Sequence, residues 1–82
     1  MHRLNATIKR VIAEVEQSVQ IHGDWQEYTP SDVKRVVEDE FFEYLGAYLN
    51  DQIEGDHGQI EELRDLAVVA IKGIIHLQRG TT

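Results

Sequence analysis

The chain has 82 residues, the size of a single domain spanning residues 1–82, and it has no cysteine for a disulfide framework or a thiolate metal site. Its formal net charge of −7 argues against binding of nucleic acid through a basic surface. No stretch approaches the roughly 18 apolar residues of a membrane span, and the N-terminus does not read as a signal peptide. We therefore expect a cytoplasmic protein with neither a nucleic acid nor a membrane as partner.

The N-terminal quarter of the chain predicts a first helix from about Asn5 to Ile21, with Gly23 as its stop. Six apolar residues recur there at helical spacing and form one stripe: Leu4, Ile8, Val11, Ile12, Val15 and Val19. The connector that follows holds Trp25, the only tryptophan of the chain. Its ring could stack on a nucleobase or could cover the end of the core, and both possibilities stay open.

A capping sequence, Thr29-Pro30-Ser31-Asp32, predicts the start of the second helix. The threonine suits the N-cap, the proline suits the first helical position, and the aspartate can complete a capping box. An apolar stripe follows, formed by Val36, Val37, Phe41, Tyr44, Leu45 and Tyr48. Glu40 falls inside this stripe, a break in the pattern of the kind found at functional sites. We expect this helix to end near residues 51–54.

A third helix is predicted from near Gly58 to about Gln78, with Arg79-Gly80 as its stop. Leu66–Ile71 is an uninterrupted apolar run, and three further apolar residues follow it: Ile74, Ile75 and Leu77. A helix that is apolar nearly all round must be buried on more than one side. We therefore expect an all-α fold with three main helices per chain in an oligomeric helical bundle. In this arrangement the third helix packs against another subunit of a homodimer or homotetramer.

Two acidic pairs, Glu40-x-x-Glu43 and Glu62-x-x-Asp65, lie inside the second and third predicted helices. Residues three apart share a helix face, so antiparallel packing of the two helices would bring the four carboxylates together. Their mutual repulsion and burial would be costly without a hard divalent cation, and carboxylate oxygens are the ligands that Mg²⁺ prefers. From spacing alone, a solvated acidic face explains the two pairs equally well.

The runs Val37–Glu43 and Ile60–Ala67 resemble the MazG-like nucleoside triphosphate pyrophosphohydrolases, an all-α family with the pattern E-x-x-E, a variable gap and E-x-x-D. The run Glu16–Trp25 is similar to small members of that family. The resemblance implies hydrolysis of a (deoxy)nucleoside triphosphate to the monophosphate and pyrophosphate. It also implies that four acids, Glu40, Glu43, Glu62 and Asp65, bind Mg²⁺, with Mn²⁺ as a substitute. Phe42 and Arg64 stand where members often have smaller side chains.

In physical terms, a metal-activated water would attack the phosphate, with Glu40 or Glu43 as the acceptor of its proton. Lys72 lies seven residues after Asp65 on the same helix face, so it could neutralise a phosphate or extend to solvent. Lys72 and Trp25 are therefore the two candidates for substrate binding. Two alternatives keep the same fold: a non-catalytic helical interaction module, and a pyrophosphohydrolase acting on another nucleotide such as phosphoribosyl-ATP.

Overall fold

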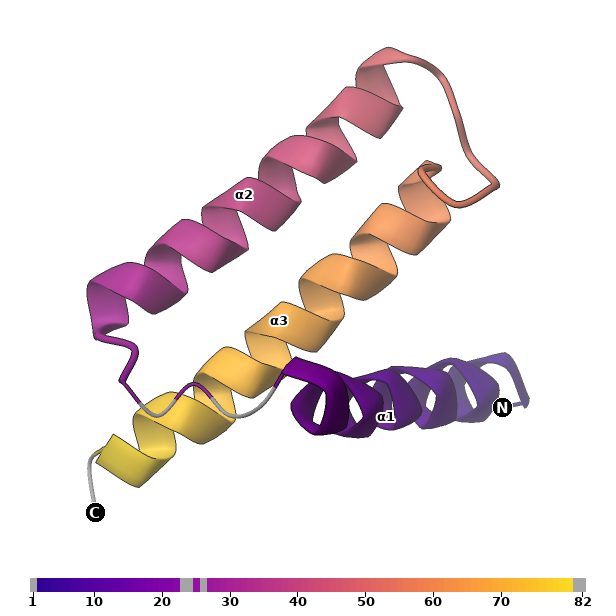
Figure 1. Ribbon diagram of the computed structural model, residues 1–82. Helices are drawn as coiled ribbons and strands as arrows, with labels where there is room; N and C mark the ends of the chain where they lie inside the picture. Colours follow the sequence, from indigo (N-terminus) through magenta and orange to yellow (C-terminus); the bar gives the residue numbers. More distant parts are fainter. Residues whose placement is uncertain (1, 23–24, 26, 81–82) are drawn as a thin grey trace.

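The computed structural model describes residues 2–22, 25 and 27–80. Within these residues the chain forms three helices and no strand: α1 (His2–His22), α2 (Pro30–Leu49) and α3 (Gln59–Gly80) (Figure 1). The predicted all-α fold with three helices is thus confirmed. The helix ends differ from the predicted ones by a few residues, and the stop expected at Gly23 lies outside the described residues. None of the described helices has the length and apolar character needed to span a bilayer.

The start of α2 is fixed by the predicted capping box. The backbone N–H of Asp32 donates to the Thr29 hydroxyl at 3.2 Å, and the backbone N–H of Thr29 donates to the Asp32 carboxylate at 2.9 Å. Both bonds satisfy N–H groups that have no partner inside the helix. These bonds fix the residue at which α2 begins, and Glu40 lies further along the same helix.

Helix α3 packs between the other two helices. It runs antiparallel to α2, and α1 crosses it on another side (Figure 1). Val11 and Val15 of α1 pack with Val68 of α3 in the core. On the α2 side, a Cβ added at Gly73 would lie 2.9 Å from Cγ1 of Val33, so the two backbones approach closely there. Among the described residues α1 does not pack against α2, and a groove therefore runs over α3 between them.

The apolar sequence of α3 is thus covered on two sides by its own chain, where we had expected one side to meet another subunit. Large apolar side chains nevertheless stay exposed on all three helices: Leu4, Ile8 and Ile12 on α1, Phe41, Phe42, Tyr48 and Leu49 on α2, and Ile60, Leu63 and Ile74 on α3. Association with a second copy remains a prediction, and it rests on these exposed side chains.

Two glycines in and after α2 should respond in opposite directions to the same substitution. A Cβ at Gly58 would lie 2.5 Å from the backbone oxygen of Glu54, and a backbone atom cannot move aside as a flexible side chain can. A Cβ at Gly46, inside α2, would meet nothing within 4 Å. We expect Gly58→Ala to lower the free energy of unfolding by about 1–3 kcal/mol, as strained sites do. Gly46→Ala should raise it by about 0.5–1 kcal/mol.

Urea unfolding of the two alanine variants, followed by circular dichroism, measures both effects against the wild type. Each variant is the control for the other, because the chemical change is the same and only the surroundings differ. Equal effects of the two substitutions would contradict the close packing at Gly58.

Candidate metal centre

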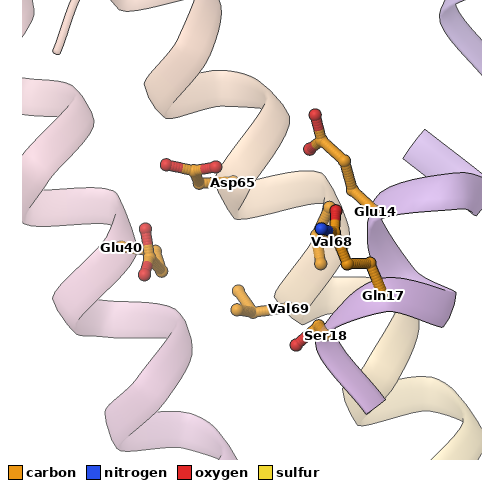
Figure 2. A pocket seen from close by; sticks show the side chains of 7 residues that line it. All are labelled: Glu14, Gln17, Ser18, Glu40, Asp65, Val68 and Val69. Carbon is orange, nitrogen blue, oxygen red and sulfur yellow. The ribbon is translucent and has the colours of Figure 1, made fainter. Parts of the chain in front are cut away.

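The antiparallel packing of α2 and α3 brings three of the four predicted acids together. One carboxylate oxygen from each of Glu40, Glu62 and Asp65 lies within 4.8 Å of the others. Figure 2 shows the carboxylates of Glu40 and Asp65 in the space between their two helices. Both acids of the second pair thus lie beside Glu40 of the first pair, because the connector after α2 returns the chain alongside that helix.

Two oxygens of this group are buried and have no hydrogen-bond partner: Oε2 of Glu40 and Oε2 of Glu62. Glu62 is only 3% exposed. Its other oxygen lies 3.5 Å from Nδ1 of the exposed His57, in the connector between α2 and α3. A buried polar atom without a partner is rare and costly, and a bound ion is one arrangement that would satisfy it. A divalent cation between the two carboxylates would supply both the partner and the opposing charge.

Glu43 lies at the edge of the centre rather than inside the group of three. Its side chain is exposed, and it lines a pocket of about 400 Å³ on the side of the connector, together with Glu62, Asp65 and His57. Its charge still acts on the centre, because it raises the pKa values of both Glu40 and Asp65. Glu43 is thus placed to meet a molecule that approaches the centre from solvent.

Burial and mutual repulsion raise the proton affinity of two carboxylates in the centre. Burial, followed by the charges of Glu43 and Asp65 and a hydrogen bond with Glu43, raises the pKa of Glu40 from 4.5 to about 7. Burial is also the largest cause of the raised pKa of Asp65, followed by the charges of Glu61 and Glu62. The metal-free centre therefore favours protonated carboxyl groups, a condition that a bound cation would reverse.

Stability of the metal-free protein should fall as the pH rises from about 4.5 to about 7. In this window the unfolded chain has already lost the proton of Glu40 while the folded chain keeps it, so the folded state binds more protons. A shift of this size corresponds to about 3 kcal/mol at most, and the partial exposure of Glu40 reduces it to about 1–2 kcal/mol.

Urea unfolding in chelator at pH 5 and at pH 8, with wild type and Glu40→Gln, measures this dependence. The glutamine variant has no proton to lose at this position, so it should lose less stability between the two pH values. An equal loss in both proteins would contradict the assignment to Glu40.

A larger pocket, of about 480 Å³, opens on the other side of the centre (Figure 2). It is the groove between α1 and α2, and its lining has three parts. The acidic part is formed by Glu14, Glu40 and Asp65, the apolar part by Val68 and Val69 of α3, and the neutral polar part by Gln17 and Ser18 of α1. Because Asp65 also lines the smaller pocket beside Glu43, the centre is accessible from two sides.

A second group of close acids, Glu14, Glu61 and Asp65, borders the same pocket. Here the carboxylates already have partners. Arg10 lies 3.2 Å from Glu14 and 3.7 Å from Glu61, and Arg64 pairs with Glu61 as well. These ion pairs offset the negative charge, so the group of Glu40, Glu62 and Asp65 is the better cation site.

The two predicted substrate-binding residues, Lys72 and Trp25, lie away from the carboxylates. The ammonium of Lys72 donates to the Ser18 hydroxyl at 2.8 Å and lies 4.6 Å from the centre of the Trp25 ring. Trp25 in turn stacks on Tyr28, with ring centres 5.1 Å apart. Both predicted residues line a separate cavity of about 80 Å³.

The polar residues of α1 that face the larger pocket, Glu14, Gln17 and Ser18, were missed as site candidates from the sequence. Glu14 and Gln17 belong to the polar face of α1, which a sequence pattern assigns to solvent. Only the spacing of Glu14 and Ser18, four residues apart and so on one face, could have grouped them. Nothing in the sequence shows that this face turns towards α2.

The resemblance to MazG-like enzymes rests on the order and spacing of the two acidic pairs. No family model, curated protein or solved structure matches the chain.

Proposed function

We propose that this protein hydrolyses a (deoxy)nucleoside triphosphate to the monophosphate and pyrophosphate, with Mg²⁺ or Mn²⁺ bound by its acidic centre. One observation carries the proposal: two buried carboxylate oxygens, from Glu40 and Glu62, have no hydrogen-bond partner. The carboxylate of Asp65 lies close to both residues. A large pocket opens directly on Glu40 and Asp65. The order of the two acidic pairs, which resembles that of the MazG-like enzymes, supports this choice of reaction. The cytoplasm, where these nucleotides occur, is the proposed location.

In this reaction, three carboxylates would hold the metal: Glu40, Glu62 and Asp65. A bound Mg²⁺ would neutralise phosphate charge and would lower the pKa of a coordinated water. Of the two acids that could accept a proton from the attacking water, Glu40 and Glu43, we assign this role to Glu43, whose exposed carboxylate lines the pocket on the side of the connector. The water oxygen bonds to the α- or the β-phosphorus of the triphosphate. The bond from that phosphorus to the oxygen bridging the α- and β-phosphates breaks, and this oxygen leaves with the other product. The proton of the water passes to Glu43 and then to solvent.

Product analysis tests this reaction. The wild-type protein is incubated with each common ribo- and deoxyribonucleoside triphosphate at equal Mg²⁺, and nucleotide, pyrophosphate and orthophosphate are quantified. We expect the monophosphate and intact pyrophosphate in equal amounts. Release of orthophosphate with the diphosphate contradicts the proposal. Phosphoribosyl-ATP belongs in the same panel, because its preferential cleavage identifies that alternative. Metal binding without any nucleotide cleavage favours the non-catalytic interaction module.

A homodimer or homotetramer is the assembly that we propose for this protein. Phe41 and Phe42 are 45% and 61% exposed and adjacent on α2, and aromatic side chains are typical of the centres of protein interfaces. Sedimentation of the wild type and of Phe42→Glu at micromolar concentration tests the assembly. We expect Phe42→Glu to sediment as a monomer and the wild type as a dimer or a tetramer. A monomeric wild type would contradict the proposal.

A further inference from the structure

The neutral wall of the larger pocket is formed by Gln17 and Ser18 of α1, and the acidic part by Glu40, Asp65 and Glu14, the last of which lies on α1 as well. The apolar floor is formed by Val68 and Val69 (Figure 2). A metal held by Glu40 and Asp65 would attract the phosphates of a nucleotide to the acidic part. The apolar floor and the neutral wall then remain for the uncharged part of the same molecule.

The hydroxyl of Ser18 is held in place from behind. The ammonium of Lys72 has only donors, so in the contact of 2.8 Å between them the serine oxygen is the acceptor. The single proton of the hydroxyl is therefore left for another acceptor, and Ser18 lines the pocket. A hydroxyl that accepts from a cation is polarised and becomes a better donor. The pocket is thus lined by a hydroxyl that can donate and that is held by the ammonium of Lys72.

Asp65 and Lys72 lie two helix turns apart on one face of α3, which is about 10 Å along the helix axis. Ser18 and Asp65 line the same pocket, and Val68 and Val69 of α3 line it as well. The amide of Gln17 adds a donor and an acceptor beside the hydroxyl, the combination that the edge of a base or a sugar requires.

We propose that Ser18 and Gln17 form the subsite for the nucleoside part of the substrate, with the Ser18 hydroxyl donating to an oxygen of the base or sugar. Lys72 is a positioning residue, which acts on the substrate through Ser18. This inference rests on the proposed reaction, because it takes the phosphates to be held at the acidic centre.

Two probes separate the two ends of the groove: a non-hydrolysable α,β-imido deoxynucleoside triphosphate and inorganic tripolyphosphate, each with Mg²⁺. Both carry the phosphates, and only the first carries a nucleoside. Binding is measured by calorimetry for wild type, Ser18→Ala, Ser18→Thr and Ser31→Ala, an exposed serine at the start of α2 that serves as the matched control.

We expect Ser18→Ala to bind the nucleotide analogue about tenfold more weakly, the typical effect of one lost hydrogen bond, with unchanged binding of tripolyphosphate. Ser18→Thr, which keeps the hydroxyl, should restore most of the affinity, and Ser31→Ala should match the wild type. Lys72→Met should weaken nucleotide binding when Ser18 is intact. It should have no further effect in the Ser18→Ala background, because it acts through that hydroxyl.

The outcomes distinguish this subsite from the reaction itself. If Ser18→Ala weakens binding of both probes equally, or of neither, the subsite is overturned while the metal centre stands. If neither probe binds the wild type in the presence of Mg²⁺, the proposed reaction and the subsite both fail.

Discussion

Replacing Glu62 by glutamine should make the metal-free protein more stable and should abolish its stabilisation by Mg²⁺ or Mn²⁺. Glu62 is the most deeply buried acid of the centre, and its Oε2 has no partner. Glutamine removes the buried charge at nearly the same shape, and its amide adds a donor beside the carboxylates of Glu40 and Asp65, each of which has an oxygen within 4.8 Å of one of Glu62. We expect the free energy of unfolding in chelator to rise by about 1–3 kcal/mol.

The stabilisation of the protein by metal should decrease in Glu62→Gln, although its stability in chelator increases. A ligand that binds only the folded protein stabilises it by about 2.7 kcal/mol at a hundred times its dissociation constant. The variant should lose most of this gain, because one of three carboxylate ligands is gone. Thermal melts with chelator, Mn²⁺ and Mg²⁺ at constant ionic strength measure both effects.

Asp39→Asn is the matched control for Glu62→Gln. It removes the same unit of charge from an exposed position next to Glu40 on α2, so its melting temperature should keep the full response to metal. A Glu62→Gln protein that is less stable in chelator and still stabilised by metal would show that the buried carboxylate has a structural role and no part in binding a cation.

Replacing Glu43 by glutamine should reduce turnover at least 100-fold, about the typical contribution of a general base. Glu43 is exposed and lies outside the group of three close carboxylates, so the variant should fold normally and keep most of its stabilisation by Mn²⁺. Loss of turnover with retained metal binding is the signature of a proton acceptor. Loss of both would identify Glu43 as a ligand.

Steady-state pyrophosphate release at saturating Mg²⁺, with thermal melts of the same samples, separates these two roles of Glu43. Asp39→Asn again serves as the control, and its turnover should equal that of the wild type. Replacement of Mg²⁺ by Ca²⁺ should preserve binding and remove most of the turnover, because the looser coordination of Ca²⁺ positions water and phosphate less well. Unchanged turnover in Glu43→Gln would rule out its role as the base.

The sequence by itself determined the helices and the start of α2, because these depend on neighbouring residues. The apolar stripes and the capping box at Thr29 are local patterns, and the structure shows both the helices and the box. The spacing of the acidic pairs is local as well, since it places both acids of a pair near one face of one helix. Each of these features depends on contacts between residues only three or four apart in the chain.

Only the tertiary structure decided which acids meet and which residues surround them. The turn after α2 and the packing of α3 bring together Glu40, Glu62 and Asp65 and leave Glu43 at the edge. The crossing of α1 over α3 brings Ser18 to the pocket and Lys72 behind it, although 54 residues separate the two in the chain. A sequence pattern gives the face on which a side chain lies, whereas its neighbours depend on how whole helices pack. That packing is set by many weak contacts with no local signature.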